Sequence, residues 1–182
     1  MLIQTQTTPN PNTLKFLLEN RLRLSLPRDF ANVDEAIGKS LLARRLFGLE
    51  GVARVFLAPE FVSITKNEEA DWVYLKTLVL HALGDFLLTG LSPIEDDDGE
   101  GASTIDDDPI IQQIKELLEA KVRPAVEQDG GDIVFERFED GILYLSMRGS
   151  CSGCPSSTAT LKNGIENMMK HYIPEVLEVR AA

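Results

Sequence analysis

Residues 133–155 of the chain read IVFERFEDGILYLSMRGSCSGCP. Two strand-like runs, residues 133–138 and residues 142–148, flank the pair Asp140-Gly141. An Asp-Gly pair suits a two-residue hairpin turn, in which both central residues need positive φ. The stretch therefore predicts a β-hairpin that continues into a loop, and this loop contains the only cysteines of the chain, Cys151 and Cys154.

Helical patterns flank this hairpin in the sequence. A helix is expected to begin at Pro109, since proline suits the first turn and the three preceding aspartates suit the positive end of the helix dipole. Arg123-Pro124 is expected to interrupt that helix. A second apolar stripe of helical spacing follows Pro155 and ends at Pro174, and a short strand is predicted over residues 175–180.

Residues 129–132, Asp-Gly-Gly-Asp, lie between the first of these helices and the hairpin. Two carboxylates permit a metal-binding interpretation, but carboxylates around paired glycines are typical of a turn. We therefore expect a turn that leads the chain into the hairpin.

The first half of the chain also mixes strand and helix patterns. Apolar residues alternate in three short runs near the N-terminus, a helix is predicted over residues 40–47, and a longer amphipathic helix is predicted over residues 71–88. The strand predictions are residues 2–4, 14–18, 22–26, 52–57 and 61–66. His81 falls on the long helix, where a solvated or core-edge histidine is the expected interpretation. This half is thus predicted to be a small α+β domain without a catalytic constellation.

An acidic segment separates the two halves. Residues 92–108 carry eight acidic side chains and no basic one, together with glycine, serine and proline. Such a segment repels itself and has little to bury, so it is expected to stay solvated as a spacer. The predicted fold class is therefore two small α+β domains, residues 1–91 and 109–182, joined by a flexible acidic linker at residues 92–108.

The composition excludes several classes of protein. With 18 Lys and Arg against 29 Asp and Glu the net charge is −11, whereas a nonspecific nucleic-acid binder needs surplus positive charge. No stretch has roughly 18 consecutive apolar residues, and the first residues match neither a signal peptide nor a transit segment. Two cysteines cannot make a disulfide framework. We therefore expect a protein of a reducing compartment, without nucleic-acid or membrane partners.

The identifiable chemistry lies in Cys151 and Cys154. Two intervening residues let both sulfurs reach one metal centre. Gly149 and Gly153 allow close backbone approach, Pro155 keeps Cys154 out of the helix, and the helix N-terminus stabilises negative charge on sulfur. We expect both thiols to be partly exposed and neither to belong to the core. A thioredoxin-type dithiol oxidoreductase, a zinc-stabilised dimer and a purely structural loop remain alternatives on this pattern.

The number of ligands constrains the site further. A zinc ion or a 4Fe–4S cluster ordinarily takes four protein ligands, and one chain offers two thiols here. His171 follows on the same predicted helix, about 24 Å from the loop at the helical rise of about 1.5 Å per residue. A second copy of the chain is therefore the simplest source of the missing thiolates.

Both halves resemble known domains in a fixed order. The C-terminal half resembles the C-terminal domain of NifU and the N-terminal half resembles the N-terminal domain of the Nfu proteins. The NifU-like motifs are residues 129–132 (DGGD), 149–157 (GSCSGCPSS), 160–162 (TLK), 164–166 (GIE) and 174–176 (PEV). The Nfu-like motifs are residues 4–6 (QTQ), 8–16 (TPNPNTLKF), 49–52 (LEGV) and 71–72 (DW).

The resemblance implies an iron–sulfur cluster scaffold or carrier rather than an enzyme. Family members hold a labile 4Fe–4S cluster between two subunits through paired cysteines, which match Cys151 and Cys154, and pass it to apo-proteins; a 2Fe–2S form is compatible with the same thiols. The implied partners are a second copy of the chain in the loaded state, upstream cluster donors and apo iron–sulfur clients. The implied location is the bacterial cytoplasm, or the mitochondrial matrix for a mature eukaryotic chain.

Overall fold

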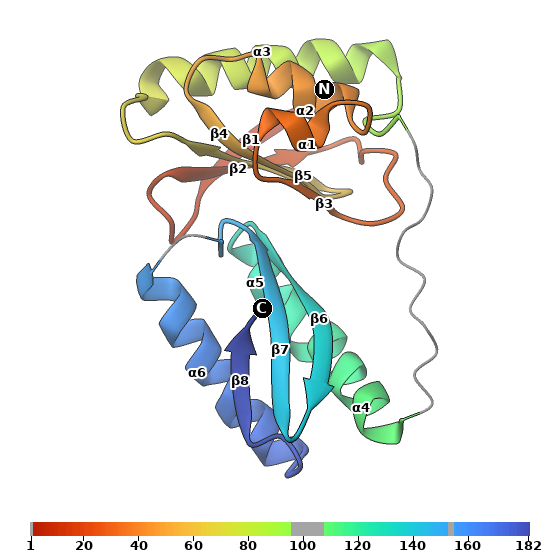
Figure 1. Cartoon of the computed structure of the whole chain (residues 1–182). Coiled ribbons are helices and arrows are strands. Elements are labelled where there is room, and N and C mark those ends of the chain that lie inside the picture. The colour runs from red at the N-terminus through yellow and green to blue at the C-terminus, as the bar shows by residue number, and fades with distance from the viewer. Residues whose placement is uncertain (1, 96–107, 153–154) are drawn as a thin grey trace. The chain divides into compact units, whose positions relative to one another are not determined.

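A computed structural model divides the chain into two compact units, residues 1–101 and residues 102–182 (Figure 1). The structure describes residues 2–95, 108–152 and 155–182, with side chains for all of these except residues 155–157. Each unit combines a sheet with helices, so the predicted class of two small α+β domains is confirmed. The division falls within residues 92–108, the segment predicted as a linker.

The N-terminal unit is built on one antiparallel sheet with the strand order β1-β2-β5-β4-β3. Its helices lie on one face of this sheet (Figure 1). Large side chains that are fully or almost fully buried between helices and sheet form the core; they include Phe16, Leu42, Leu46, Ile64, Leu83 and Phe86. In chain order the elements are β1 Ile3–Thr7, β2 Thr13–Leu18, β3 Arg28–Phe30, α1 Val33–Ala36, α2 Leu41–Phe47, β4 Val52–Leu57, β5 Phe61–Lys66 and α3 Trp72–Thr89.

The two longer helices of this unit begin at capping residues that the sequence indicates. The Ser40 hydroxyl accepts a hydrogen bond from the Ala43 N–H at 3.0 Å, and an Asp71 oxygen accepts one from the Val73 N–H at 2.9 Å. α3 ends at Gly90, whose φ of 66° is left-handed. Both predicted helices are thus confirmed. In the part of the chain that the structure describes, no helix is both long and apolar enough to cross a membrane.

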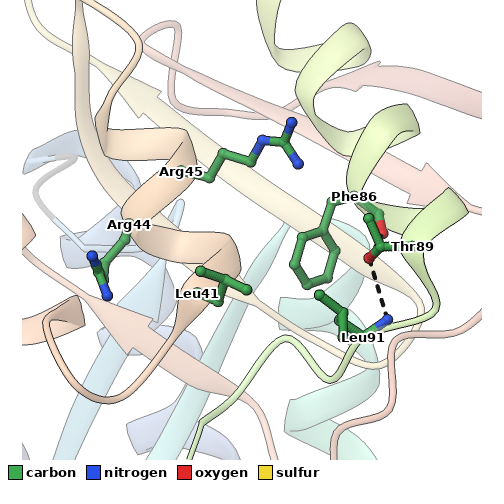
Figure 2. Close-up of a pocket in the computed structure, with 6 residues that line it drawn as sticks. All are labelled: Leu41, Arg44, Arg45, Phe86, Thr89 and Leu91. Carbon is green, nitrogen blue, oxygen red and sulfur yellow. Dashed lines mark hydrogen bonds between the residues drawn. The ribbon is translucent and has the colours of Figure 1, made fainter.

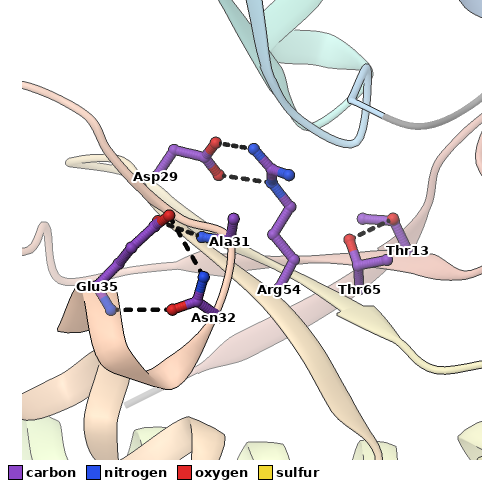
Figure 3. Close-up of polar contacts among 7 residues, drawn as sticks. All are labelled: Thr13, Asp29, Ala31, Asn32, Glu35, Arg54 and Thr65. Atoms are coloured by element: carbon purple, nitrogen blue, oxygen red, sulfur yellow. Dashed lines mark hydrogen bonds and ion pairs between the residues drawn. The ribbon is translucent and has the colours of Figure 1, made fainter. Parts of the chain in front are cut away.

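Polar contacts hold the shorter elements in register (Figure 3). Arg54 of β4 forms an ion pair with Asp29 of β3, with Nε 3.0 Å from Oδ1. The hydroxyl groups of Thr13 and Thr65 lie 2.8 Å apart and join β2 to β5. α1 is only four residues long, and the reciprocal hydrogen bonds between Asn32 and Glu35 at its start compensate for its few internal ones.

Two expectations for the N-terminal half are wrong. Residues 22–26 are not a strand: the N–H groups of Leu22 and Leu24 donate to the carbonyls of Pro59 and Leu22, and the strand that pairs with β4 is Arg28–Phe30. The expected linker also begins too early. Ile94 is buried in the N-terminal core, and the Glu95 N–H donates to the Lys39 carbonyl at 2.8 Å. An apolar side chain with a core site to enter outweighs the polar composition around it.

The C-terminal unit has a three-stranded sheet in the order β6-β7-β8. β6 and β7 form the predicted hairpin, closed by Asp140 and Gly141 with φ of 51° and 77°. β8 pairs with β7 in parallel, and α6 supplies the connection that a parallel pair requires. The elements are α4 Pro109–Leu117, a π-helical segment Leu118–Val122, α5 Arg123–Gln128, β6 Gly131–Glu139, β7 Ile142–Gly149, α6 Pro155–Tyr172 and β8 Glu178–Ala181.

The expected interruption at Arg123-Pro124 takes the form of a π-helical segment just before this pair and not of a break in the helix. Helical structure continues through this pair, because residues Leu118–Val122 adopt a π-helical turn. A proline lacks the N–H for the ordinary hydrogen bond and crowds the carbonyl four residues earlier, and a wider turn relieves both problems. The predicted last strand is also shorter than expected, since it begins at Glu178 instead of residue 175.

Candidate functional site

The candidate site lies where β7 leads towards α6. β7 ends at Gly149, whose φ of 65° turns the chain into the cysteine loop. The Ser150 N–H donates to the Gly130 carbonyl at 3.2 Å, and the Ser150 hydroxyl donates to the Asp129 carbonyl. Gly131 and Gly149 are also paired across the two strands. These contacts therefore hold the start of the loop against the turn that precedes β6.

The Cys151 thiol points into the core of the C-terminal unit. The residue is 7% exposed and belongs to the apolar cluster of that unit. A Cβ at Gly131 would lie 2.7 Å from the Cys151 sulfur and 2.8 Å from the Arg148 carbonyl oxygen. The missing side chain of Gly131 thus leaves the space that the sulfur fills.

This burial corrects the expectation of an exposed thiol outside the core. The physical reason is that a thiol behaves as a small apolar group and enters a core site when one is available. The sequence signal that could have located the site is the Asp-Gly-Gly-Asp run, because two adjacent glycines beside a strand indicate close backbone approach. Cys154, the other predicted ligand, lies outside the described residues, as does Gly153.

The helix after the loop begins as the sequence predicts. α6 starts at Pro155, and the Thr158 hydroxyl donates to the Cys151 carbonyl at 3.2 Å. The first helical turn is thereby tied to the loop. Since the first N–H groups of a helix lack internal partners and carry partial positive charge, this end of α6 favours a thiolate near it.

Asp129 and Asp132 have structural partners. Asp129 is the C-cap residue of α5, and its carbonyl accepts a hydrogen bond from the Ser150 hydroxyl. Asp132 is 3% exposed, and its Oδ1 accepts hydrogen bonds from the Arg123 Nε at 3.1 Å and from the Ile133 N–H at 2.8 Å. The turn interpretation is therefore supported. The ion pair with Arg123 braces the turn against α5, a role that sequence reasoning missed.

The two histidines belong to elements other than the cysteine loop. His171 is in the last turn of α6, sixteen residues after Pro155, and its ring contacts the Tyr172 ring with 5.0 Å between centroids. His81 lies on α3 in the N-terminal unit, with Nδ1 3.2 Å from an Asp85 oxygen. Within residues 2–95, 108–152 and 155–182, no three His, Cys, Asp or Glu side chains gather in a metal-binding group.

One carboxylate connects α6 to the edge of the sheet. Glu166 accepts hydrogen bonds from the Lys170 ammonium at 2.7 Å and from the Val179 N–H of β8 at 3.0 Å. The Lys170 hydrogen bond, followed by the one from Val179, holds the pKa of Glu166 below its ordinary value. Glu166 thus holds α6, the helix that directly follows the cysteine loop, against β8.

The chain matches two protein-family models. One, described as "Scaffold protein Nfu/NifU N terminal", matches residues 3–90, and the other, described as "NifU-like domain", matches residues 114–180. Together they span most of the chain, in the order in which the sequence resemblance places them.

Relatives match along nearly all of the chain. A human protein named "NFU1 iron-sulfur cluster scaffold homolog, mitochondrial" is 47% identical over 178 residues, which are 97% of this chain and 70% of that protein. The protein of the same name from Drosophila erecta is 47% identical over 182 residues, and the chain spans 64% of its length. Among solved structures, the solution structure of a NifU-like protein from Saccharomyces cerevisiae has a TM-score of 0.47 at 31% identity, covering 53% of this chain and 86% of that one.

Proposed function

Because this chain belongs to the Nfu family of scaffold proteins, we propose that it carries an iron–sulfur cluster and delivers it to apo-proteins without acting as an enzyme. The observation that carries the proposal is the cysteine loop within the NifU-like domain, in a chain that has both family domains in order. The cluster is the cargo of this reaction. The function needs a compartment that keeps thiols reduced, which the bacterial cytoplasm and the mitochondrial matrix both are.

The cargo is a 4Fe–4S cluster held by Cys151 and Cys154 of two copies of the chain. Such a cluster takes four protein ligands, and each copy contributes two thiolates. A two-fold contact that presents the same loop from both subunits completes the set. The same loops could hold a 2Fe–2S cluster, which also takes four cysteines. Upstream donors supply the cluster, and apo iron–sulfur clients receive it.

Loading requires the Cys151 side chain to leave its buried position. The contacts that hold the loop start are two hydrogen bonds from Ser150 to the turn before β6 and one from Thr158 to the Cys151 carbonyl. When the loop turns outward, the thiol loses its proton and the thiolate binds iron. The N-terminal end of α6 favours this anionic form.

Delivery is a ligand exchange without a change in oxidation state. A client thiolate forms a sulfur–iron bond, the bond from Cys151 or Cys154 to the same iron breaks, and the released thiolate takes up a proton. Four such exchanges move the cluster. The Cys151 thiol then returns to the site beside Gly131, and this return to an apolar environment favours release.

Anaerobic reconstitution with iron and sulfide tests the proposal. The wild-type chain should become brown and contain about four irons for every two chains. Cys151→Ala is the preferred ligand variant, because alanine leaves no unsatisfied hydroxyl in the core, and it should lose the cluster, as should Cys154→Ser. Unchanged iron and sulfide in either variant would refute the ligand assignment.

The same samples distinguish the alternatives. A colourless protein that contains zinc would favour a zinc-stabilised dimer, since the thiols alone do not select iron over zinc. Catalytic reduction of insulin disulfides would favour a dithiol oxidoreductase.

A further inference from the structure

The N-terminal unit contains a groove whose lining residues are far from the cysteine loop in the sequence. It has a volume of about 390 Å³ and lies between α2 and the C-terminal end of α3 (Figure 2). Its lining residues are Leu41, Arg44, Arg45, Phe86, Thr89 and Leu91. Leu41 is 37% exposed and Leu91 is 55% exposed, while Phe86 is buried. The groove therefore presents accessible apolar side chains above a packed aromatic ring.

Two arginines flank this apolar surface. Leu41 precedes Arg44 and Arg45 by three and four residues, so all three side chains lie near one face of α2. Figure 2 shows Leu41 facing Phe86 and Leu91, with the Arg45 side chain above this apolar group and Arg44 on the far side of Leu41. Arg45 thus lies beside the apolar part of the groove, and Arg44 lies at its outer edge.

Both guanidinium groups are loosely held. Arg44 Nη1 lies 3.6 Å from a Glu95 oxygen and Arg45 Nη2 lies 3.8 Å from an Asp85 oxygen, and the two arginine side chains are 47% and 45% exposed. Charge-assisted hydrogen bonds of this kind are about 2.7–2.9 Å long, so these pairs are weak ones. Each arginine can therefore receive a further carboxylate without breaking a close hydrogen bond.

We propose that this groove docks a partner protein through a short segment in which leucine-like side chains alternate with carboxylates. The charge of the groove selects this occupant, because a neutral apolar segment would cover two arginines without pairing them. A purely acidic segment would leave Leu41 and Leu91 in water.

The identity of the partner, a cluster donor or an apo client, rests on the proposed function, whereas the binding itself does not. The groove is made by the N-terminal unit, and Cys151 belongs to the C-terminal unit. Docking is therefore expected in protein that contains no cluster. Peptide binding can therefore be tested independently of cluster loading, and a negative result in one experiment does not decide the other.

Fluorescence anisotropy on the full, cluster-free chain provides the test. The probes are three labelled peptides: one with two leucines among glutamates, one with glutamines in place of the glutamates, and one with serines in place of the leucines. The glutamate–leucine peptide should bind at least about tenfold more tightly than either of the others, since each change removes one class of contact. Its affinity should fall as salt is raised.

Matched variants locate the binding. Replacing both arginines (Arg44→Gln with Arg45→Gln) should weaken the glutamate–leucine peptide about tenfold or more, whereas Arg21→Gln, an exposed arginine of the same unit, should not. Leu91→Ser should also weaken it, whereas Val73→Ser, an exposed apolar residue at the other end of α3, should not. Melting temperatures of the variants verify that each one is folded.

Several results would overturn the proposal. Equal binding of the three peptides would show that the groove has no such selectivity, and undiminished binding by the double arginine variant would place the site elsewhere. Self-association of the cluster-free wild type that disappears in the double variant would assign the groove to a second copy instead. Failed reconstitution of the cluster would leave this inference standing, because the peptide assay uses no cluster.

Discussion

At the scale of single residues, the candidate site depends on a pair that is distant in sequence, Gly131 and Cys151. The thiol occupies the space that a side chain at Gly131 would take. A buried sulfur is protected from oxidation, whereas an exposed thiolate is not. The fold thus keeps the Cys151 thiol covered, and the proposed loading requires a loop movement first.

Gly131→Ala tests this pairing. The added methyl group would meet both the Cys151 sulfur and the Arg148 backbone at under 3 Å, so the loop must shift. We expect a loss of about 1–3 kcal/mol of unfolding free energy in urea and faster labelling of the thiol by a disulfide reagent.

Gly164→Ala is the matched control for that variant. No atom lies within 4 Å of a Cβ at this helical position, so the substitution should be neutral or stabilising, by up to about 1 kcal/mol. A Gly131→Ala protein with wild-type stability and labelling rate would contradict the packing described for Cys151.

At the scale of elements, α6 and β8 are joined by the Glu166 carboxylate. Its hydrogen bonds to Lys170 and to the Val179 N–H lower its pKa in the folded protein. The unfolded chain therefore binds the proton more tightly. Glu166 stabilises the fold above its ordinary pKa of 4.5, and this contribution is lost as the pH falls below that value towards the lowered pKa.

Glu166→Gln should remove that pH dependence. In the wild type, hydrogen-exchange protection of the Val179 amide should fall as the pH is lowered below 4.5, after correction for the intrinsic exchange rate. In the variant it should be lower at neutral pH and change less on acidification. Glu116→Gln, an exposed glutamate on α4, is the control and should behave like the wild type. An unaltered pH profile in Glu166→Gln would contradict this role of the carboxylate.

Local sequence patterns predict most of these elements. The Asp71 cap and Gly90 bound α3, and Asp140-Gly141 closes the hairpin, because each feature is determined by nearby backbone chemistry. Residues 22–26 alternate like a strand but do not pair, since pairing depends on which strand lies beside them. The burial of Ile94 and Cys151 likewise depends on residues far away in the chain, which no local pattern contains.

At the scale of the whole molecule, the cysteine spacing predicts the candidate site but not its arrangement. Cys151 lies in the core of the C-terminal unit. Cys154 and residues 96–107 lie outside the described residues. The pairing of the two thiols and the nature of the linker therefore stay predictions. The proposed ligand set belongs to the assembly of two chains and not to one chain. One chain supplies two thiols, and the proposed cargo takes four ligands.

Native mass spectrometry of the anaerobically reconstituted protein tests the shared cluster most directly. It weighs the intact complex and counts chains and clusters together. The predicted species is two chains with a single 4Fe–4S cluster, which separates into single chains when the cluster is removed by chelation. A 4Fe–4S cluster retained by one chain alone would contradict the central claim, because that chain would then provide every ligand itself.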